Sequence, residues 1–288
     1  MPDARPFFSM FAASSPEKRS KWQKNNKRLL MIRHPHIMDT SMTTSVLSRR
    51  RDIAERYAKT SWEQILFSEF STSLESSNRP FPCIFGVRGF KLDQLRYVFQ
   101  ENLDLDLTSA ALQEFVRDAR SFGPNTSLVI FTRPEEIKSI DAYQEEFWKI
   151  LKGLADRDHT PWPEHMPTEI THPEWEFCFA GEPVFVVCNT PAHIFRQSRR
   201  ASSFMLTFQP RWVFDKILGT EKSTQTAFGA VRKRIAHYDF LPVSPKLGKY
   251  GHPGVLESEQ YFLDDRNQGG SSCPFQALGE RHGAAIRQ

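Results

Sequence analysis

The sequence feature that most constrains the fold is the short apolar run Pro183–Cys188, which ends abruptly at Asn189, Thr190 and Pro191. A run of Val and Phe of this length, bounded by turn-forming residues, is typical of a buried strand and is too short for a core helix. Asn and Thr are good helix N-caps, and Pro suits the first helical position because its missing N–H would have no intrahelical partner there. The sequence therefore predicts a buried strand followed by a helix that begins near Pro191.

Side chains with functional chemistry follow this strand. His193 would lie in the first turn of the predicted helix, with Arg196, Arg199 and Arg200 further along it. Residues three, four or seven apart share a helix face, so at least Arg196 and Arg200 should lie on the same face as the imidazole. We expect a side chain able to bind metal and others able to bind carboxylates to converge at the end of the strand. The alternative is that His193 only caps the helix or satisfies hydrogen bonds in the core.

Hydrophobic periodicity predicts the other elements of the chain. The predicted helices are 52–74 (one helix or a broken pair), 92–100, 108–122, 134–155, a helix that starts at Pro210, and 226–238. The predicted strands lie near 83–87, 127–132, 175–179, 183–188 and 203–209, and residues 260–263 are expected to form an extended edge. This order predicts a single α+β domain over residues 52–276, with a mixed, mainly antiparallel sheet covered by helices.

The two ends of the chain differ from this domain. Residues 1–51 are rich in Lys and Arg and poor in Asp and Glu, whereas the remainder is mildly acidic. Such a basic segment is predicted to be a disordered extension without catalytic residues; a transit peptide, a nucleic-acid-binding arm and a translation start at Met42 are the alternatives. Residues 277–288 are predicted to be a disordered tail.

Hydropathy and cysteine usage limit the cellular context. No apolar run approaches the roughly 20 residues that cross a bilayer, and the N-terminal part has no apolar segment like that of a secretory signal. The cysteines form no C-x-x-C pair, which favours reduced, buried thiols over a zinc site; they are Cys83, Cys178, Cys188 and Cys273. We therefore expect a cytoplasmic protein with neither a membrane nor a nucleic-acid partner.

A series of motifs resembles that of the YqcI/YcgG family over about residues 61–276. The motifs are Phe81-Pro-Cys-Ile-Phe-Gly86, Pro161-Trp-Pro163, the segment from His172 to Gly181, Cys188-Asn-Thr-Pro-Ala-His193, Ser198-Arg-Arg200, Phe208-Gln-Pro-Arg-Trp212, Leu247-Gly-Lys-Tyr-Gly251 and Cys273-Pro-Phe275. The resemblance implies a haem-dependent N-hydroxylase, with haem b as cofactor, O₂ or peroxide as oxidant, and a guanidine (arginine-type) compound or a related amine as substrate. Because the sequence has no G-x-G-x-x-G fingerprint for a nicotinamide or flavin, any electrons are expected from a separate reductase.

The resemblance also implies roles for individual residues. A haem site needs an axial ligand, an apolar slot and cations for two propionates. The residues expected in these roles are His193 as the iron ligand, Arg196, Arg199 and Arg200 as propionate partners, and Phe81 and Cys83 in the cofactor site. A thiolate ligand, either Cys83 or Cys188, is the alternative.

The substrate should impose its own requirement on the site. A guanidinium is planar and cationic, so its pocket should offer a carboxylate in bidentate geometry and an aromatic face. The acids nearest to the central strand are Glu174, Glu176 and Glu182, and among them Glu176 is predicted to be catalytic.

Two other functional classes fit the same residues. A non-catalytic haem-binding or sensor protein would keep His193 and the arginines but would need no substrate carboxylate. A cysteine hydrolase would pair Cys188 or Cys83 with His193, with Asn189 as the orienting residue.

Overall fold

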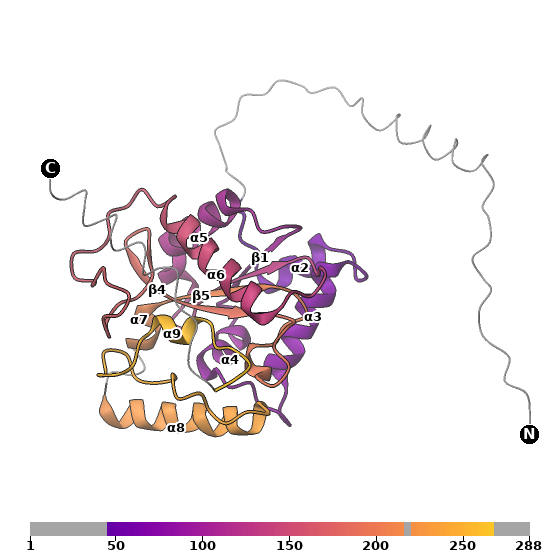
Figure 1. The fold of residues 1–288 in the computed structure, drawn as a ribbon. Coiled ribbons are helices and arrows are strands. Elements are labelled where there is room, and N and C mark those ends of the chain that lie inside the picture. The colour runs from indigo at the N-terminus through magenta and orange to yellow at the C-terminus, as the bar shows by residue number, and fades with distance from the viewer. Residues whose placement is uncertain (1–44, 216–219, 268–288) are drawn as a thin grey trace, which may run out of the picture. The chain divides into compact units, whose positions relative to one another are not determined.

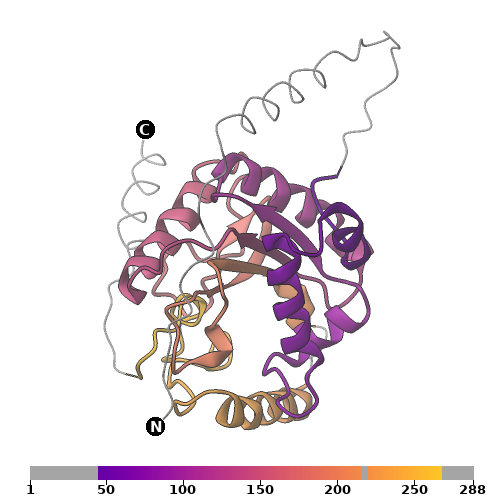
Figure 2. The same cartoon turned by 90° about the vertical axis from the view of Figure 1, so that its right-hand side faces the viewer.

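The computed structural model describes residues 45–215 and 220–267 of the chain (Figures 1 and 2). Its centre is one five-stranded sheet with the strand order β1-β2-β5-β4-β3. The strands are β1 Arg96–Gln100, β2 Leu128–Thr132, β3 Cys178–Phe179, β4 Glu182–Asn189 and β5 Met205–Pro210. Only β1 and β2 pair in parallel, and the other three neighbouring pairs are antiparallel. The prediction of an α+β domain with a mixed, mainly antiparallel sheet is confirmed.

Helices surround this sheet. They are α2 Arg50–Arg56, α3 Trp62–Glu75, α4 Ile84–Lys91, α5 Leu105–Phe122, α6 Ile140–Ala155, α7 Arg211–Asp215, α8 Glu221–Tyr238 and α9 Ser258–Tyr261, with a 3₁₀ turn η1 at Gln197–Arg199. The long helices follow their apolar periodicity, and side-chain caps fix their starts: Ser61 for α3, Asp104 for α5 and Ser139 for α6. Of the two alternatives for 52–74, one helix or a broken pair, the structure has the pair, α2 and α3.

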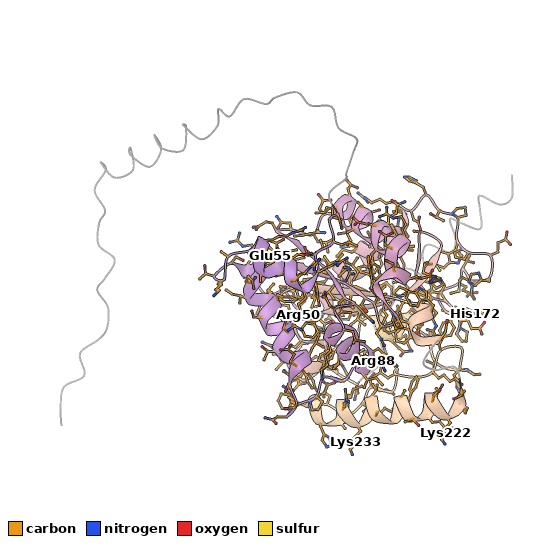
Figure 3. All side chains as sticks on the ribbon, turned by 180° about the vertical axis from the view of Figure 1, so that it is seen from behind. Arg50, Glu55, Arg88, His172, Lys222 and Lys233 are labelled. Carbon is orange, nitrogen blue, oxygen red and sulfur yellow. The ribbon has the colours of Figure 1, made fainter. Side chains whose placement is uncertain are left out.

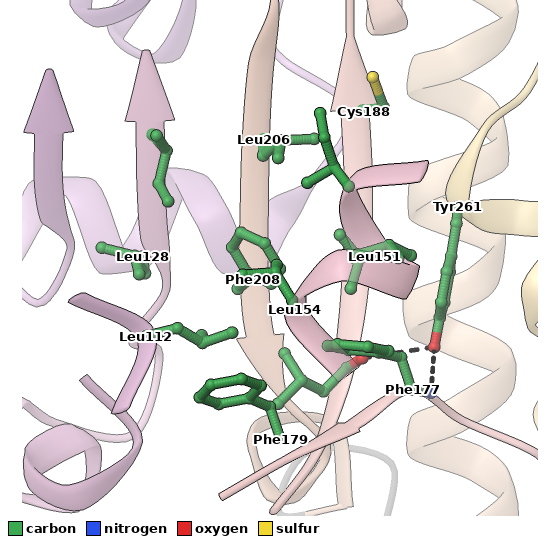
Figure 4. Packing of buried hydrophobic residues seen from close by; sticks show 14 of the residues in the cluster. Leu112, Leu128, Leu151, Leu154, Phe177, Phe179, Cys188, Leu206, Phe208 and Tyr261 are labelled. Atoms are coloured by element: carbon green, nitrogen blue, oxygen red, sulfur yellow. Dashed lines mark hydrogen bonds between the residues drawn. The ribbon is translucent and has the colours of Figure 1, made fainter. Parts of the chain in front are cut away.

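One face of the sheet packs against α5 and α6 (Figure 4). Side chains alternate along a strand, so every second residue of β4 and β5 points to this face. The labelled residues of this core are Leu112, Leu128, Leu151, Leu154, Phe177, Phe179, Cys188, Leu206, Phe208 and Tyr261. Tyr261 accepts a hydrogen bond from the amide of Phe177 at 3.0 Å, which fixes α9 against this core.

The other face of the sheet is covered in two different ways. Over β1 and β2, apolar residues of α3 and α4 such as Phe67 and Phe90 pack on Tyr97 and Phe131. Over β4 and β5 the covering element is α8, whose Lys222 and Lys233 point away from the body (Figure 3). This second region holds the cavity described below.

Two elements differ in type from the sequence prediction. Residues 83–87 were predicted as a strand but belong to the start of α4, because the Cys83 side chain caps the helix by accepting a hydrogen bond from Gly86 N. Residues 92–100 were predicted as a helix, but Asp93 takes a positive φ of 53° after α4 and β1 follows. Pairing of these residues with the buried strand β2 outweighs their local preference for a helix. A strand that is buried on both faces also lacks the alternation of apolar and polar residues by which strands are predicted.

The helix predicted from Pro191 does not form. The amides of residues 194–196 instead donate to the carboxylate of Asp265, at distances from 2.6 to 2.9 Å. Thr190 does use its hydroxyl, but it accepts from Ala192 N within a tight turn, and the chain then returns to pair with Thr190 at Arg200. A carboxylate distant in sequence therefore binds the N–H groups that would have begun the helix.

Several boundaries also differ. Residues 45–51 were assigned to the basic extension, but Ser48 exchanges backbone hydrogen bonds with Tyr97 and α2 already begins at Arg50, so this part belongs to the fold. The helix predicted from Pro134 begins at Ile140, and the strand predicted over 175–179 is reduced to β3. The edge predicted over 260–263 begins inside α9. The predictions for residues 1–44, for the tail 277–288 and for Cys273 lie outside the described residues.

Candidate functional site

The open face of β4 and β5 forms the floor of a cavity of about 280 Å³. The floor residues are those whose side chains alternate away from α5 and α6, among them Phe185 and Val187 of β4 and Thr207 and Gln209 of β5. The walls come from the start of α4, from α7, from one side of α8 and from the segment 247–263. A volume of this size accommodates a ligand much larger than water.

The middle of the cavity is aromatic. Phe214 of α7 makes edge-on contacts with Phe85 of α4 at 5.8 Å and with Phe185 of β4 at 5.6 Å between ring centroids. All three line the cavity, and Phe81 and Phe228 add to its walls. Because Phe214 contacts both other rings, the three form one continuous apolar wall of the cavity.

Arginine side chains also line the cavity. Arg196 is 1% exposed and donates to Asp264 O and Asn267 Oδ1 at 2.7 Å each, but its Nη1 has no hydrogen-bond partner among the described residues. Arg199 is 7% exposed and donates to Gln260 O at 2.9 Å, and its Nη1 also has no hydrogen-bond partner in the described part of the chain. Burial lowers the pKa of Arg199 to about 10, although the guanidinium remains charged at neutral pH. Arg196 Nη1 lies 3.9 Å from Oδ2 of the buried Asp239, so this guanidinium already has an acidic partner, whereas Arg199 Nη1 has no hydrogen-bond partner among the described residues.

The third predicted arginine lies elsewhere. Arg200 is exposed, is not part of the cavity lining, and donates back to the carbonyl oxygens of Pro191 and His193 at 3.2 and 3.1 Å. The predicted helix would have aligned it with Arg196, and the turn that replaces the helix separates them.

His193 is fully buried and is not among the residues that line the cavity. Its Nε2 lies 2.8 Å from Leu263 O, which can only accept, so Nε2 carries the hydrogen; Nδ1 then accepts from the Thr190 hydroxyl at 2.8 Å. Burial lowers the pKa of His193 to about 4, so the ring is neutral. Both nitrogens are engaged, and neither is free to bind a metal in this arrangement.

The cysteines separate into different environments. Cys83 lines the cavity, with its Sγ at the start of α4 and 3.3 Å from Gly86 N. Cys188 is buried in the core on the opposite face of the sheet, and Cys178 is buried in β3. Burial raises the pKa of each of these thiols. Neither Cys83 nor Cys188 is hydrogen-bonded to His193 within the described chain, so the Cys/His pair of the hydrolase alternative is not assembled.

Acidic residues surround Arg211 at another part of the wall. Its Nη1 lies 2.9 Å from Glu257 Oε1 and 3.7 Å from Glu176 Oε2, and its guanidinium stacks on Tyr250, with Cζ 3.4 Å from the ring centroid. Glu257, Arg211 and Tyr250 line the cavity, whereas Glu176 does not. We call these four residues the acidic corner. Sequence reasoning selected Glu176 and missed Glu257, whose only signal was its position shortly after the motif that contains Tyr250.

A family model described as the YqcI/YcgG family matches residues 70–276. The chain belongs to this family. Two relatives in the family from Bacillus subtilis (strain 168) are named uncharacterized protein YcgG and uncharacterized protein YqcI. They are 40% identical over 225 residues and 39% identical over 226 residues, each match covering 75% of this chain and 89% of the relative.

A further relative is named as a putative enzyme. The "Putative N(omega)-hydroxy-L-arginine synthase DcsA" of Streptomyces lavendulae is 31% identical over 225 residues, which are 74% of this chain and 84% of that protein. No solved structure matches the chain significantly.

Family motifs that are far apart in the sequence meet at the cavity. Residues of Phe81–Gly86, Phe208–Trp212 and Leu247–Gly251 all contribute to its lining. In this member of the YqcI/YcgG family, the described residues include no group of three or more His, Cys, Asp or Glu side chains that could hold a metal ion by themselves. Within the same described ranges no helix is both long and apolar enough to cross a membrane.

Proposed function

We propose that this protein N-hydroxylates a guanidine group, of the arginine type or a related amine, in a small molecule bound in the cavity. The observation that carries the proposal is that one cavity combines an aromatic wall, buried arginines and the buried carboxylate of Glu257. The relationship to a protein named as a putative hydroxy-arginine synthase supports the same substrate class.

We also propose that the cavity holds haem b. The lining is compatible with a haem: Phe85, Phe185 and Phe214 supply an apolar wall, and Arg196 and Arg199 are the cations that would face its propionates. We infer Cys83, rather than His193, as the iron ligand, because its sulfur lines the cavity and both nitrogens of the histidine are already hydrogen-bonded.

The surroundings of Cys83 suit a thiolate. Its Sγ accepts from Gly86 N at the start of α4, where the helix dipole favours negative charge, and the Arg199 charge acts in the same direction. Burial is the larger effect and raises the pKa of the free thiol, so the proton would leave only when a metal binds the sulfur.

The chemistry also sets the need for partners. When bound, haem b would supply the activation of O₂ or peroxide, while the protein residues bind and orient the substrate and keep water out. Transfer of one oxygen atom from O₂ into an N–H bond, with release of water, consumes two electrons and two protons. A separate reductase would supply those electrons, whereas hydrogen peroxide would need none.

The test is a spectrum of the full chain purified from cells supplied with a haem precursor, followed by incubation with L-arginine and either peroxide or a reductase system. We expect a Soret band, a long-wavelength ferrous–CO band that Cys83→Ser abolishes and Cys188→Ser retains, and a product heavier by one oxygen atom. A long-wavelength band that survives Cys83→Ser would favour Cys188 as the iron ligand, and haem loss in His193→Ala alone would favour His193. Haem without product from any guanidine or amine would favour the non-catalytic binder, and absence of both would refute the proposal.

A further inference from the structure

The acidic corner has more buried carboxylates than cations. Glu176 is fully buried and Glu257 is 5% exposed, and both face the single guanidinium of Arg211. The remaining acid near Arg211 is Asp215, which is 65% exposed in its side chain and lies 3.6 Å away, so water screens its charge. With both buried acids ionised, the corner would carry an uncompensated negative charge.

Glu176 also lacks hydrogen bonds. Both carboxylate oxygens are buried and have no hydrogen-bond partner among the described residues, and the contact with Arg211 at 3.7 Å is too long to be one. A buried carboxylate without donors is costly unless another group compensates it. The pKa of Glu176 is raised well above its ordinary value, first by burial and then by the charges of Glu257 and Asp215, which agrees with a missing cation.

The corner already binds one guanidinium, that of Arg211. Arg211 makes the two kinds of contact by which a guanidinium is recognised, stacking on Tyr250 at 3.4 Å and a hydrogen bond to Glu257 at 2.9 Å, and a ligand would share both residues with it. Glu257 is pre-oriented, because Arg211 donates to its Oε1 and Gln260 Nε2 donates to its Oε2 at 3.0 Å. Each carboxylate oxygen can accept a second hydrogen bond, so bidentate pairing with a planar ligand remains open.

We propose that the acidic corner is the guanidinium subsite of the cavity and that Glu257 is the carboxylate that the ligand contacts. Glu257 and Tyr250 line the cavity, whereas Glu176 contacts Arg211 from outside the lining and does not touch the ligand. Arg211 is a positioning residue that holds the Glu257 carboxylate in place. The proposal rests on the proposed function for its substrate class, and it transfers the predicted substrate contact from Glu176 to Glu257.

The subsite should select for charge. A cationic guanidine supplies a positive charge that pairs with the Glu257 carboxylate. A ureido group has nearly the same shape, but it has no charge and carries an oxygen in place of one NH₂ group. Against the Glu257 carboxylate that oxygen would leave an acceptor facing an acceptor. L-Arginine and agmatine should therefore bind and L-citrulline should not, whether or not the ligand carries a carboxylate of its own.

The experiment is isothermal titration calorimetry of the full-length purified protein with L-arginine, agmatine and L-citrulline, without oxidant. Glu257→Gln removes the charge and keeps the shape, and we expect it to weaken arginine binding about 10- to 100-fold, as for loss of a charged hydrogen bond. Glu259→Gln is the matched control, because Glu259 lies two residues away on α9 with its side chain 45% exposed. The affinity of this variant for L-arginine should equal that of the wild type.

A second pair of variants protects the test against misfolding of Glu257→Gln, which circular dichroism would detect. Tyr250→Phe keeps the aromatic face and should retain binding, whereas Tyr250→Leu should lose it. Equal affinities for arginine and citrulline, no arginine binding by the wild type, or wild-type affinity in both Glu257→Gln and Tyr250→Leu would overturn the subsite. Binding that depends on Glu257 without any hydroxylation would refute the proposed function alone, and hydroxylation with unchanged KM in Glu257→Gln would refute the subsite alone.

Discussion

Replacing His193 by glutamine should make the protein's stability less sensitive to acid. In the folded protein the imidazole is neutral, with Nε2 donating to Leu263 O and Nδ1 accepting from Thr190 Oγ1, both at 2.8 Å. Protonation would place a hydrogen on Nδ1, which carries none in the neutral ring, and would put a charge in the core. Burial therefore lowers the pKa of His193 from 6.5 to about 4. In the unfolded chain the ring titrates near its ordinary value. Between these two pH values the unfolded state binds one proton more than the folded state.

The sign and size of the pH dependence of the unfolding free energy follow from this difference in bound protons. Stability rises with pH wherever the unfolded state binds more protons, so the contribution of His193 to wild-type stability should be lost as the pH falls from about 6.5 towards 4. The full interval corresponds to about 3 kcal/mol of unfolding free energy, and about 2.5 kcal/mol should already be lost at pH 4.5. The raised pKa values of Glu176 and Glu257 act in the opposite direction, but they are common to both proteins and cancel in the difference.

The assay is urea unfolding followed by circular dichroism at a series of pH values from 7.5 to 4.5, for the wild type and His193→Gln. Glutamine is chosen because its amide can still donate to the carbonyl of Leu263 and does not titrate. The variant will be less stable at neutral pH, since its packing differs, but its stability should fall less with acid than that of the wild type. Parallel pH curves would refute the neutral, buried imidazole and would reopen the assignment of His193 as a metal ligand.

Further changes test other parts of the structure. Gly89→Ala would place a Cβ 2.1 Å from a backbone oxygen and should destabilise by about 1–3 kcal/mol in urea unfolding. The matched control Gly229→Ala, where a Cβ meets nothing within 4 Å in a helix, should stabilise by about 0.5–1 kcal/mol, and equal effects would contradict the packing around Gly89. Asp265→Ala leaves the amides of 194–196 without their carboxylate and should lower the melting temperature and reduce retention of any cavity ligand; an unchanged melting temperature would show that the turn does not depend on it. The raised pKa of Glu176 means that its folded form binds the extra proton, so the contribution of this carboxyl group to stability should fall as the pH rises above about 4.5. The unfolding free energy of the wild type minus that of Glu176→Gln should therefore decrease with rising pH. A difference that increases with pH would contradict the charge excess.

Elements with a local sequence signal could be predicted from the amino-acid sequence. The run at 183–188 lies in β4, the helix predicted over 108–122 lies within α5, and the helix predicted over 134–155 overlaps α6. Such predictions succeed because a strand or helix that buries one face shows that face as a periodic pattern in its own residues. The motifs that resemble the YqcI/YcgG family were equally local, and the family model that matches residues 70–276 confirms the family.

The positions of the functional side chains depend on contacts between distant residues. Asp265 binds the amides that would have started a helix at Pro191, and in the turn that forms instead Arg200 lies outside the cavity lining and His193 is buried. Strand alternation predicts that Cys188 and Asn189 point to opposite faces, but which face is filled by helices and which holds the cavity depends on packing. Glu176 and Glu257 likewise meet at one arginine across a long interval of chain. Such contacts join residues that are far apart in sequence, and no local window of residue types records which distant partner will satisfy a given charge or amide.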